Sequence, residues 1–203
     1  REDLELLSKL KKMGVVSMSP TWNISNALGA GAYDEKSNTG LTELGRKFVG
    51  VCEEKNIIID AVHASRKTFE DIAKISKKPF IVSHTACYSV NKHRRNLTDK
   101  QIRAVVTSGG IIGLCFIKNF LGKNSIDAAI AHLKHLVNIA GEDYVAIGSD
   151  FDGMSKEDLV KGLDDVSKMP MFFSRCKTAG IQERILEKVS FKNAFRFFKE
   201  NLD

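Results

Sequence analysis

The sequence predicts an α/β fold in which parallel strands alternate with helices. Short apolar runs recur along the chain, and segments with helical spacing of apolar residues separate them. Apolar runs without polar alternation are typical of parallel strands that are buried on both faces. In addition, residues capable of catalysis or metal binding follow several of these runs, at the position where parallel α/β folds form their active sites.

The predicted elements follow one another in regular order. A first helix is expected over 1–13, where leucines recur at helical spacing and Gly14 supplies a stop. Five apolar runs are expected to form strands: Val15–Met18, Ile57–Val62, Phe80–Ser83, Ile111–Phe116 and Tyr144–Gly148. The remaining helices are expected over 42–55, 66–76, 98–108, 125–140, 171–179, 181–189 and 191–201.

Two local patterns add detail to these helices. Thr98 and Gln101 have the spacing of a capping box, which predicts a helix start at this point. Phe191, Phe195 and Phe198 form an apolar stripe on the last helix, and we expect this stripe to pack in the core.

Length and composition indicate a folded protein. The 203 residues are 43% apolar, enough for one domain or a large part of one. The net charge of +6 comes from basic residues that are interleaved with 25 acidic ones, which indicates a solvated surface rather than a nucleic-acid partner. Neither a GxGxxG sequence nor a Walker phosphate loop occurs, but the pattern alone leaves both an open sheet and part of a barrel possible.

The cysteines and the hydropathy bear on location. Cys52, Cys87, Cys115 and Cys176 lie far apart without a CxxC pair, so we expect free thiols and a cytoplasmic protein. No apolar run is long enough to span a bilayer, and the C-terminus lacks the apolar tail that a lipid anchor requires. We therefore expect no membrane partner.

Candidate site residues fall where predicted strands end. His63 and His84 each follow one strand, and Asp150 and Asp152 follow another. A single histidine in such a place is usually structural, but two at successive strand ends could hold a cation such as Zn²⁺. A nearby aspartate could then act as general base. His132 and His135 lie within a helix without an acid motif, and we expect surface or packing roles for them.

Two arginines follow His84 on the same predicted loop. Arg94 or Arg95 could bind a carboxylate through two parallel hydrogen bonds. A surface pair beside a helix explains them equally well, so residue chemistry leaves the choice open.

These residues belong to a longer pattern that resembles the membrane dipeptidase, or renal dipeptidase, family of zinc peptidases. The matching stretches are DAVHAS (60–65), FIVSHTACYSV (80–90), RRN (94–96), GSDFDG (148–153) and GLDDVSK (162–168). The intervals of 21 residues between the two histidines and of 11 residues from His84 to Arg95 also agree. The resemblance extends over essentially the whole chain.

The resemblance implies a TIM-type (β/α)₈ barrel that hydrolyses dipeptides with two zinc ions and a metal-bridging water. It implies that His63 and His84 are zinc ligands, that Arg95 binds the substrate carboxylate, and that Asp150 is the catalytic acid and base. Of the eight barrel units, this chain would supply about five. Residues 1–203 are then expected to be a single incomplete domain that lacks its N-terminal units.

The chain departs from the family pattern in two respects. The family takes a His-x-Asp pair and a bridging glutamate from strands that lie upstream of residue 1, so the ligands for one zinc are largely missing here. In the family a histidine polarises the substrate carbonyl, and the matching position is Trp22, which offers only an indole N–H. Trp22 is therefore expected to contact the substrate in a different way from that histidine. The sequence leaves open whether the protein forms a homodimer.

Two other functions compete with the metallodipeptidase. The chain could be a metal-free, inactive barrel relative, which the presence of the upstream His-x-Asp pair would exclude. It could also be another metal-dependent amidohydrolase, acting on cyclic amides or phosphoesters. Arg95 argues against that alternative, because a carboxylate clamp suits a substrate with a free C-terminus. A binding module without enzymatic activity fits least, since it needs no titratable groups at several strand ends.

Overall fold

The computed structural model describes residues 4–34 and 39–202. Their contacts form two compact units, which we describe separately. Unit 1 comprises the described residues of Arg1–Val82, Ala104–Gly110 and Phe197–Asp203. Unit 2 comprises Ser83–Arg103 and Ile111–Arg196. The expectation of one incomplete domain stays a prediction.

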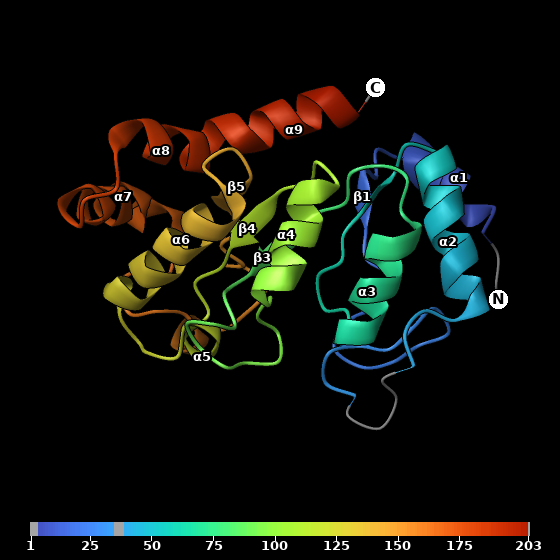
Figure 1. The fold of residues 1–203 in the computed structure, drawn as a ribbon, viewed down its shortest axis with the longest axis horizontal. Coiled ribbons are helices and arrows are strands. Elements are labelled where there is room, and N and C mark those ends of the chain that lie inside the picture. Colours follow the sequence, from blue (N-terminus) through green and yellow to red (C-terminus); the bar gives the residue numbers. More distant parts are fainter. Residues whose placement is uncertain (1–3, 35–38, 203) are drawn as a thin grey trace. The chain divides into compact units, whose positions relative to one another are not determined.

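Unit 1 contains a pair of parallel strands and three helices (Figure 1). In chain order these are α1 (Leu6–Lys12), β1 (Ser17–Met18), α2 (Glu43–Glu54), β2 (Ile58–Ile59) and α3 (Arg66–Ile75). Each lies within a segment predicted from the sequence, although the strands are shorter than predicted. The expected beginning of the first helix, residues 1–3, lies outside the described residues.

Parallel pairing and helix caps build this unit. Ser17 pairs with Ile58 in a parallel register. The hydroxyl of Thr42 accepts the Gly45 N–H at the start of α2, and the hydroxyl of Ser65 accepts the Thr68 N–H at the start of α3. Each cap satisfies a backbone donor that the helix leaves unpaired.

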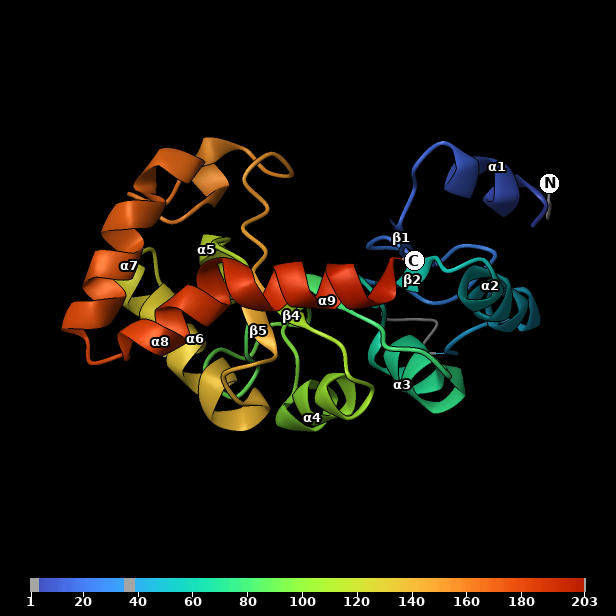
Figure 2. The same cartoon turned by 90° about the horizontal axis from the view of Figure 1, so that it is seen from above.

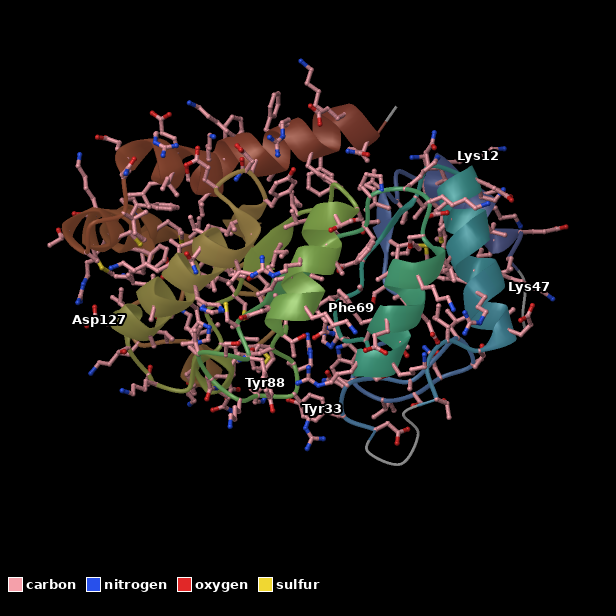
Figure 3. The ribbon with its side chains drawn as sticks, in the orientation of Figure 1. Lys12, Tyr33, Lys47, Phe69, Tyr88 and Asp127 are labelled. Atoms are coloured by element: carbon pink, nitrogen blue, oxygen red, sulfur yellow. The ribbon has the colours of Figure 1, made fainter. Side chains whose placement is uncertain are left out.

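The core of unit 1 is aromatic and aliphatic. Phe69 (Figure 3) is buried in α3. Its ring meets that of Phe80 edge-on, with 5.7 Å between the ring centroids. Ile59 of β2 and Ile72 of α3 are also buried. By contrast, Lys47 is exposed on α2, as the amphipathic pattern requires.

Unit 2 is built on a three-stranded sheet in the order β3-β4-β5. The elements are β3 (Val82–Thr85), α4 (Asp99–Thr107), β4 (Ile112–Leu114), α5 (Lys118–Leu121), α6 (Ile126–Ala140) and β5 (Val145–Ile147). By their contacts, the first residue of β3 and the second half of α4 belong to unit 1. β4 and β5 are parallel, and α6 lies beside β5 in both views (Figures 1 and 2). Parallel strands joined through helices confirm the predicted α/β class. Helix α5 was not predicted.

The predicted capping box is confirmed at the start of α4. The Gln101 N–H donates to the Thr98 hydroxyl at 3.3 Å, and the Thr98 N–H donates to the Gln101 side-chain oxygen at 3.0 Å. The reciprocal pair satisfies two backbone donors, so this local sequence pattern alone was enough to place the helix.

After β5 the chain is helical except for short loops. Two 3₁₀ turns, η1 (Lys156–Asp158) and η2 (Val166–Lys168), precede α7 (Met169–Thr178) and α8 (Glu183–Glu187). A π-helical turn, η3 (Lys188–Lys192), then leads into α9 (Asn193–Asn201) and packs against β5 (Figure 2). The three long helical segments agree with the prediction, and the 3₁₀ and π turns were not predicted.

The expected core packing of the phenylalanine stripe is wrong for Phe191 and Phe195, whereas Phe198 is half-buried. Phe191 and Phe195 are 60% and 54% exposed and stack on each other at 5.1 Å. The buried residues of this segment are Val189, Asn193 and Phe197, which form a different stripe of the same helix. Helical spacing offered two apolar stripes, and the partners of Asn193 decide between them.

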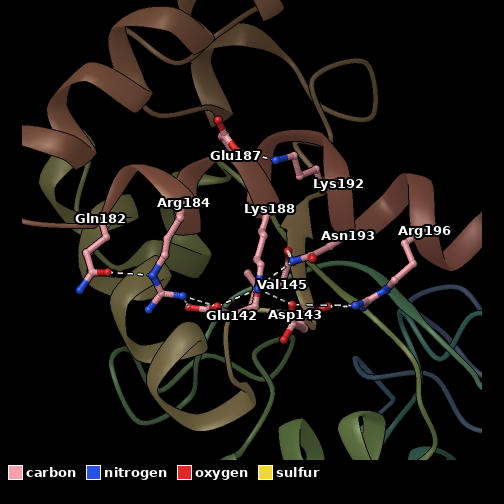
Figure 4. Close-up of polar contacts among 10 residues, drawn as sticks. All are labelled: Glu142, Asp143, Val145, Gln182, Arg184, Glu187, Lys188, Lys192, Asn193 and Arg196. Carbon is pink, nitrogen blue, oxygen red and sulfur yellow. Dashed lines mark hydrogen bonds and ion pairs between the residues drawn. The ribbon is translucent and has the colours of Figure 1, made fainter.

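Asn193 joins the last helix to the α6–β5 connection (Figure 4). Its side-chain amide donates to the carbonyl oxygens of Glu142 and Val145, at 2.8 Å each. Around it, Lys188 lies 2.7 Å from a carboxylate oxygen of Glu142 and 2.7 Å from one of Asp143. The buried amide therefore determines which side of the helix faces β5.

All four cysteines are described. They are free, as the sequence predicted, and the structure buries each of them. Burial raises the pKa of Cys52, Cys115 and Cys176 to about 12. Thiols held in the protonated form are poor nucleophiles. Among the described residues, every helix is too short or too polar to cross a membrane.

Candidate metal and substrate site

Three of the predicted site residues meet in unit 2. The Nε2 atom of His84 lies 3.3 Å from a guanidinium nitrogen of Arg95 and 3.7 Å from a carboxylate oxygen of Asp150. His84 was expected just beyond its strand, but the structure places it within β3. Arg95 comes from the loop after β3, and Asp150 comes from the turn after β5. Two of these side chains therefore reach His84 from separate loops.

The contacts of His84 indicate its protonation state. Arginine can only donate hydrogen bonds, so its neighbour Nε2 is the acceptor and Nδ1 carries the proton. That Nδ1 atom lies 3.2 Å from the hydroxyl oxygen of Ser83. Burial lowers the pKa of His84, the charge of Asp150 opposes this shift, and Arg95 lowers the pKa further. The neutral imidazole is the form that binds metals.

Arg95 is held by its own loop together with α5 and the end of β3. It is 8% exposed, and its guanidinium carbon lies 5.2 Å from the centre of the Phe120 ring. His93 stacks on Phe120 at 4.6 Å, and its Nδ1 accepts the Arg95 N–H at 3.3 Å. The Thr85 hydroxyl donates to the Arg95 carbonyl oxygen at 3.0 Å. A guanidinium fixed in this way is preorganised for bidentate binding of a carboxylate.

The neighbouring arginine is placed differently. Arg94 is exposed, whereas Arg95 lies against His84. The structure thus separates two residues that the sequence could not distinguish by their chemistry. His93 and Phe120, which support Arg95, were missed by the sequence analysis. His93 is only two residues from Arg95, but nothing in the sequence pointed to Phe120.

Asp150 has an unusual backbone. Its φ of +60° lies in the left-handed region, which non-glycine residues rarely adopt. A Cβ on Gly153 would come within 2.1 Å of an Asp150 carboxylate oxygen, so a larger residue at this position would push the carboxylate aside. Backbone strain of this type concentrates at functional sites. Asp152, in the same turn, is exposed.

The other two predicted residues, His63 and Trp22, meet in unit 1. The centres of their rings are 5.9 Å apart, with the ring planes tilted by 36°. His63 also has a left-handed backbone, with φ of +63°. Its Nδ1 lies 2.8 Å from the side-chain oxygen of Asn23. The sequence analysis assigned no role to Asn23, although it directly follows Trp22.

His132 and His135 are outside this site, as the sequence predicted. His132 is fully buried in α6, where its Nδ1 accepts the Cys87 N–H at 3.0 Å and its Nε2 lies 3.3 Å from the Leu121 carbonyl oxygen. Burial lowers the pKa of His132 to about 4. His135 pairs with Asp99 at 2.8 Å. Both therefore have structural roles, and His132 supports the loop that leads to Arg95.

Within residues 4–34 and 39–202, the His, Cys, Asp and Glu side chains do not gather in groups of three or more that could hold a metal ion. The nitrogen donors of interest are those of His63 in unit 1 and His84 in unit 2.

Comparisons with known proteins support the resemblance. A solved metallo peptidase from Rhodobacter sphaeroides, bound to a phosphinate mimic of the dipeptide L-Ala-D-Ala, matches with a TM-score of 0.90 and 31% identity, covering 98% of this chain and 60% of that chain. Dipeptidase ataJ of Aspergillus terreus is 35% identical over 169 residues, which cover 80% of this chain and 40% of that protein. A Klebsiella pneumoniae protein from the pqqA 5′ region is 33% identical over 198 residues, covering 92% of this chain and 72% of that protein.

The chain thus spans less than two thirds of the first two of these relatives. The sequence profile of the membrane dipeptidase family, peptidase family M19, matches residues 1–202. Because the profile extends over almost the entire chain and the fold agrees with that of a solved metallopeptidase, the chain belongs to the membrane dipeptidase family.

Proposed function

We propose that this chain is the C-terminal part of a zinc-dependent dipeptidase with a (β/α)₈ barrel. The observation that carries the proposal is the meeting of His84, Arg95 and Asp150 in unit 2. The parallel pairs β1–β2 and β4–β5 agree with consecutive barrel strands. Three further strands and their helices would complete such a barrel. On this proposal residues 1–203 are one incomplete domain.

The donor chemistry of the two histidines fits zinc. Neutral imidazole nitrogen is a common zinc ligand. The contact of His63 Nδ1 with an amide oxygen and the contact of His84 Nε2 with a guanidinium both favour a proton on Nδ1 and a lone pair on Nε2. We therefore assign both residues as zinc ligands. Bound zinc would supply Lewis-acid chemistry, which acidifies a water and polarises the carbonyl under attack.

Arg95 would bind the free carboxylate of the dipeptide. Its burial and its support by Phe120 and His93 leave little conformational freedom to lose on binding. This role also favours a dipeptidase over an amidohydrolase for cyclic amides or phosphoesters, whose substrates offer no terminal carboxylate.

Asp150 would carry the proton in the reaction. It would accept a proton from the attacking water as the new C–O bond forms and would donate it to the leaving amine as the C–N bond breaks. Trp22, which is 66% exposed beside His63, would contact the substrate through its ring or its indole N–H.

The test uses the full-length protein that contains this chain. The protein is stripped with a chelator, and the hydrolysis of a set of dipeptides is measured before and after the addition of Zn²⁺. Matched tripeptides and C-terminally amidated dipeptides serve as controls. We expect zinc to restore rapid hydrolysis of the dipeptides, with much slower hydrolysis of the amidated dipeptides and none of the tripeptides. A full-length protein that binds zinc at His63 and His84 but leaves every dipeptide intact would exclude the proposal.

A further inference from the structure

The loop over residues 20–34 folds around His63 in unit 1. The Asn23 side-chain oxygen lies 2.8 Å from His63 Nδ1. The Ala32 N–H donates to the His63 carbonyl oxygen at 2.8 Å, and the Tyr33 N–H donates to the Asn23 carbonyl oxygen at 2.8 Å. The successive backbone amides of Ala32 and Tyr33 thus hold the backbones of His63 and Asn23.

Gly31 makes this arrangement possible. A Cβ at Gly31 would lie 2.5 Å from the Asn23 carbonyl carbon and oxygen and 2.6 Å from the Trp22 carbonyl oxygen. Contacts this short are not tolerated, and the atoms involved are backbone atoms that cannot rotate away. Any side chain at Gly31 would therefore displace Asn23 from His63. The backbone of the loop therefore fixes the contact between Asn23 and His63.

The bond between the two side chains determines the tautomer of His63. An amide oxygen only accepts hydrogen bonds, so the partner nitrogen, Nδ1, must carry the proton. The lone pair of the neutral ring is then on Nε2. Second partners of this kind set the ring orientation of metal-binding histidines, and their loss typically weakens metal binding about 10- to 100-fold.

We propose that Asn23 is a positioning residue that holds His63 with its lone pair on Nε2, ready to bind the divalent cation. This inference rests on the proposed function, because it assigns His63 to the metal. It adds a residue from a loop that lies 40 positions away in the sequence. The same loop holds both the carbonyl oxygen and the ring of His63, whose backbone is left-handed.

The first experiment measures the tautomer without metal. In the ¹⁵N-labelled, metal-free full-length protein, the ring nitrogens of His63 are assigned by comparison with His63→Gln. We expect the proton on Nδ1 in the wild type and in Asn23→Asp, which retains an acceptor oxygen. We expect a shift toward Nε2–H in Asn23→Leu, which has a similar volume but no acceptor. An unchanged tautomer in Asn23→Leu would overturn the inference.

The second experiment measures zinc affinity in the full-length protein, with Zn²⁺ alone and a competing chelator. We expect Asn23→Leu to weaken zinc binding about 10- to 100-fold and Asn23→Asp to retain it. Gly31→Ala should weaken it similarly, although Asn23 is intact. If Asn23→Leu does not fold, Gly31→Ala and Asn23→Ala test the same contact.

Asn26→Ala is the matched control. Asn26 belongs to the same loop, where its side chain contacts Pro20, Leu28 and Gly29 instead of His63. We expect its zinc affinity to stay within about twofold of the wild type. Equal losses in Asn26→Ala and Asn23→Leu would mean that loop order matters and the bond to His63 does not.

The two experiments also separate this inference from the proposed function. Suppose that the tautomer of His63 depends on Asn23 but that His63→Gln leaves zinc affinity unchanged. His63 would then not be a zinc ligand, and both the proposed zinc site and the role of Asn23 would be overturned. Zinc binding that requires His63 but tolerates Asn23→Leu would retain the proposed function and overturn the role of Asn23.

Discussion

Replacing Arg95 with alanine tests the carboxylate site most directly. The side chain is 8% exposed and contacts both His84 and the Phe120 ring, so the substrate would meet a guanidinium that is already ordered and largely desolvated. Losing a charge-assisted, bidentate pair in such a place costs on the order of 2–4 kcal/mol. We therefore expect kcat/KM for dipeptides to fall by about thirty- to a thousandfold.

The assay compares two substrates in the full-length protein. Dipeptides with a free C-terminus should lose activity mainly through a higher KM, whereas the slow hydrolysis of amidated analogues should change little. Arg95→Lys should recover only part of the loss, because an ammonium group cannot form the two parallel hydrogen bonds. Melting temperatures check that each variant is folded.

Arg94→Ala is the control for charge. It removes the same charge from the same loop, but Arg94 is exposed. We expect a change of about twofold or less, as is usual for a screened surface charge. The role of Arg95 is refuted if Arg95→Ala affects free and amidated substrates equally, or if Arg94→Ala has the same effect.

Three further predictions concern other residues. Asp150→Asn in the full-length protein should lower kcat by about a hundred- to ten-thousandfold while zinc content is retained. Asp152→Asn should leave kcat far less affected. If pH–rate profiles show the reverse, Asp152 is the catalytic residue. Because burial holds the pKa of His132 near 4, below its usual value of 6.5, its stabilising contribution is complete above pH 6.5 and is lost toward pH 4. This amounts to on the order of 3 kcal/mol, and urea unfolding of His132→Gln should lack that part of the pH dependence. Asn193→Leu should lower the free energy of unfolding by about 1–3 kcal/mol, because the Glu142 and Val145 carbonyl oxygens lose their donor, and a variant as stable as the wild type would contradict this.

Much of the fold could be predicted from local sequence. Apolar runs located all five strands, and helical spacing with caps such as Thr98 and Gln101 located the longer helices. These signals act between residues that are close in the chain, so the sequence contains them in readable form. Short features such as η3 escaped prediction, because their geometry depends on the packing of the last helix against β5.

The last helix illustrates the limit of periodicity. Phe191 and Phe195 have the spacing of a buried stripe, yet the helix turns Val189 and Phe197 inward. Both stripes satisfy the same helical period. The hydrogen bonds of Asn193 to the α6–β5 connection favour the stripe that is buried, and these partners are about fifty residues away.

The sequence by itself determined the α/β class, the family and the residue types of the candidate site. Each of these depends on the order and spacing of residues along the chain. Residue chemistry left Arg94 and Arg95 equivalent, the family resemblance favoured Arg95, and the tertiary structure placed Arg95 beside His84. The tertiary structure alone decided that His84 lies within β3 and that Asn23 contacts His63. The physical reason is that side-chain contacts between loops depend on where each loop folds back, and residues 40 positions apart carry no local signal of their meeting.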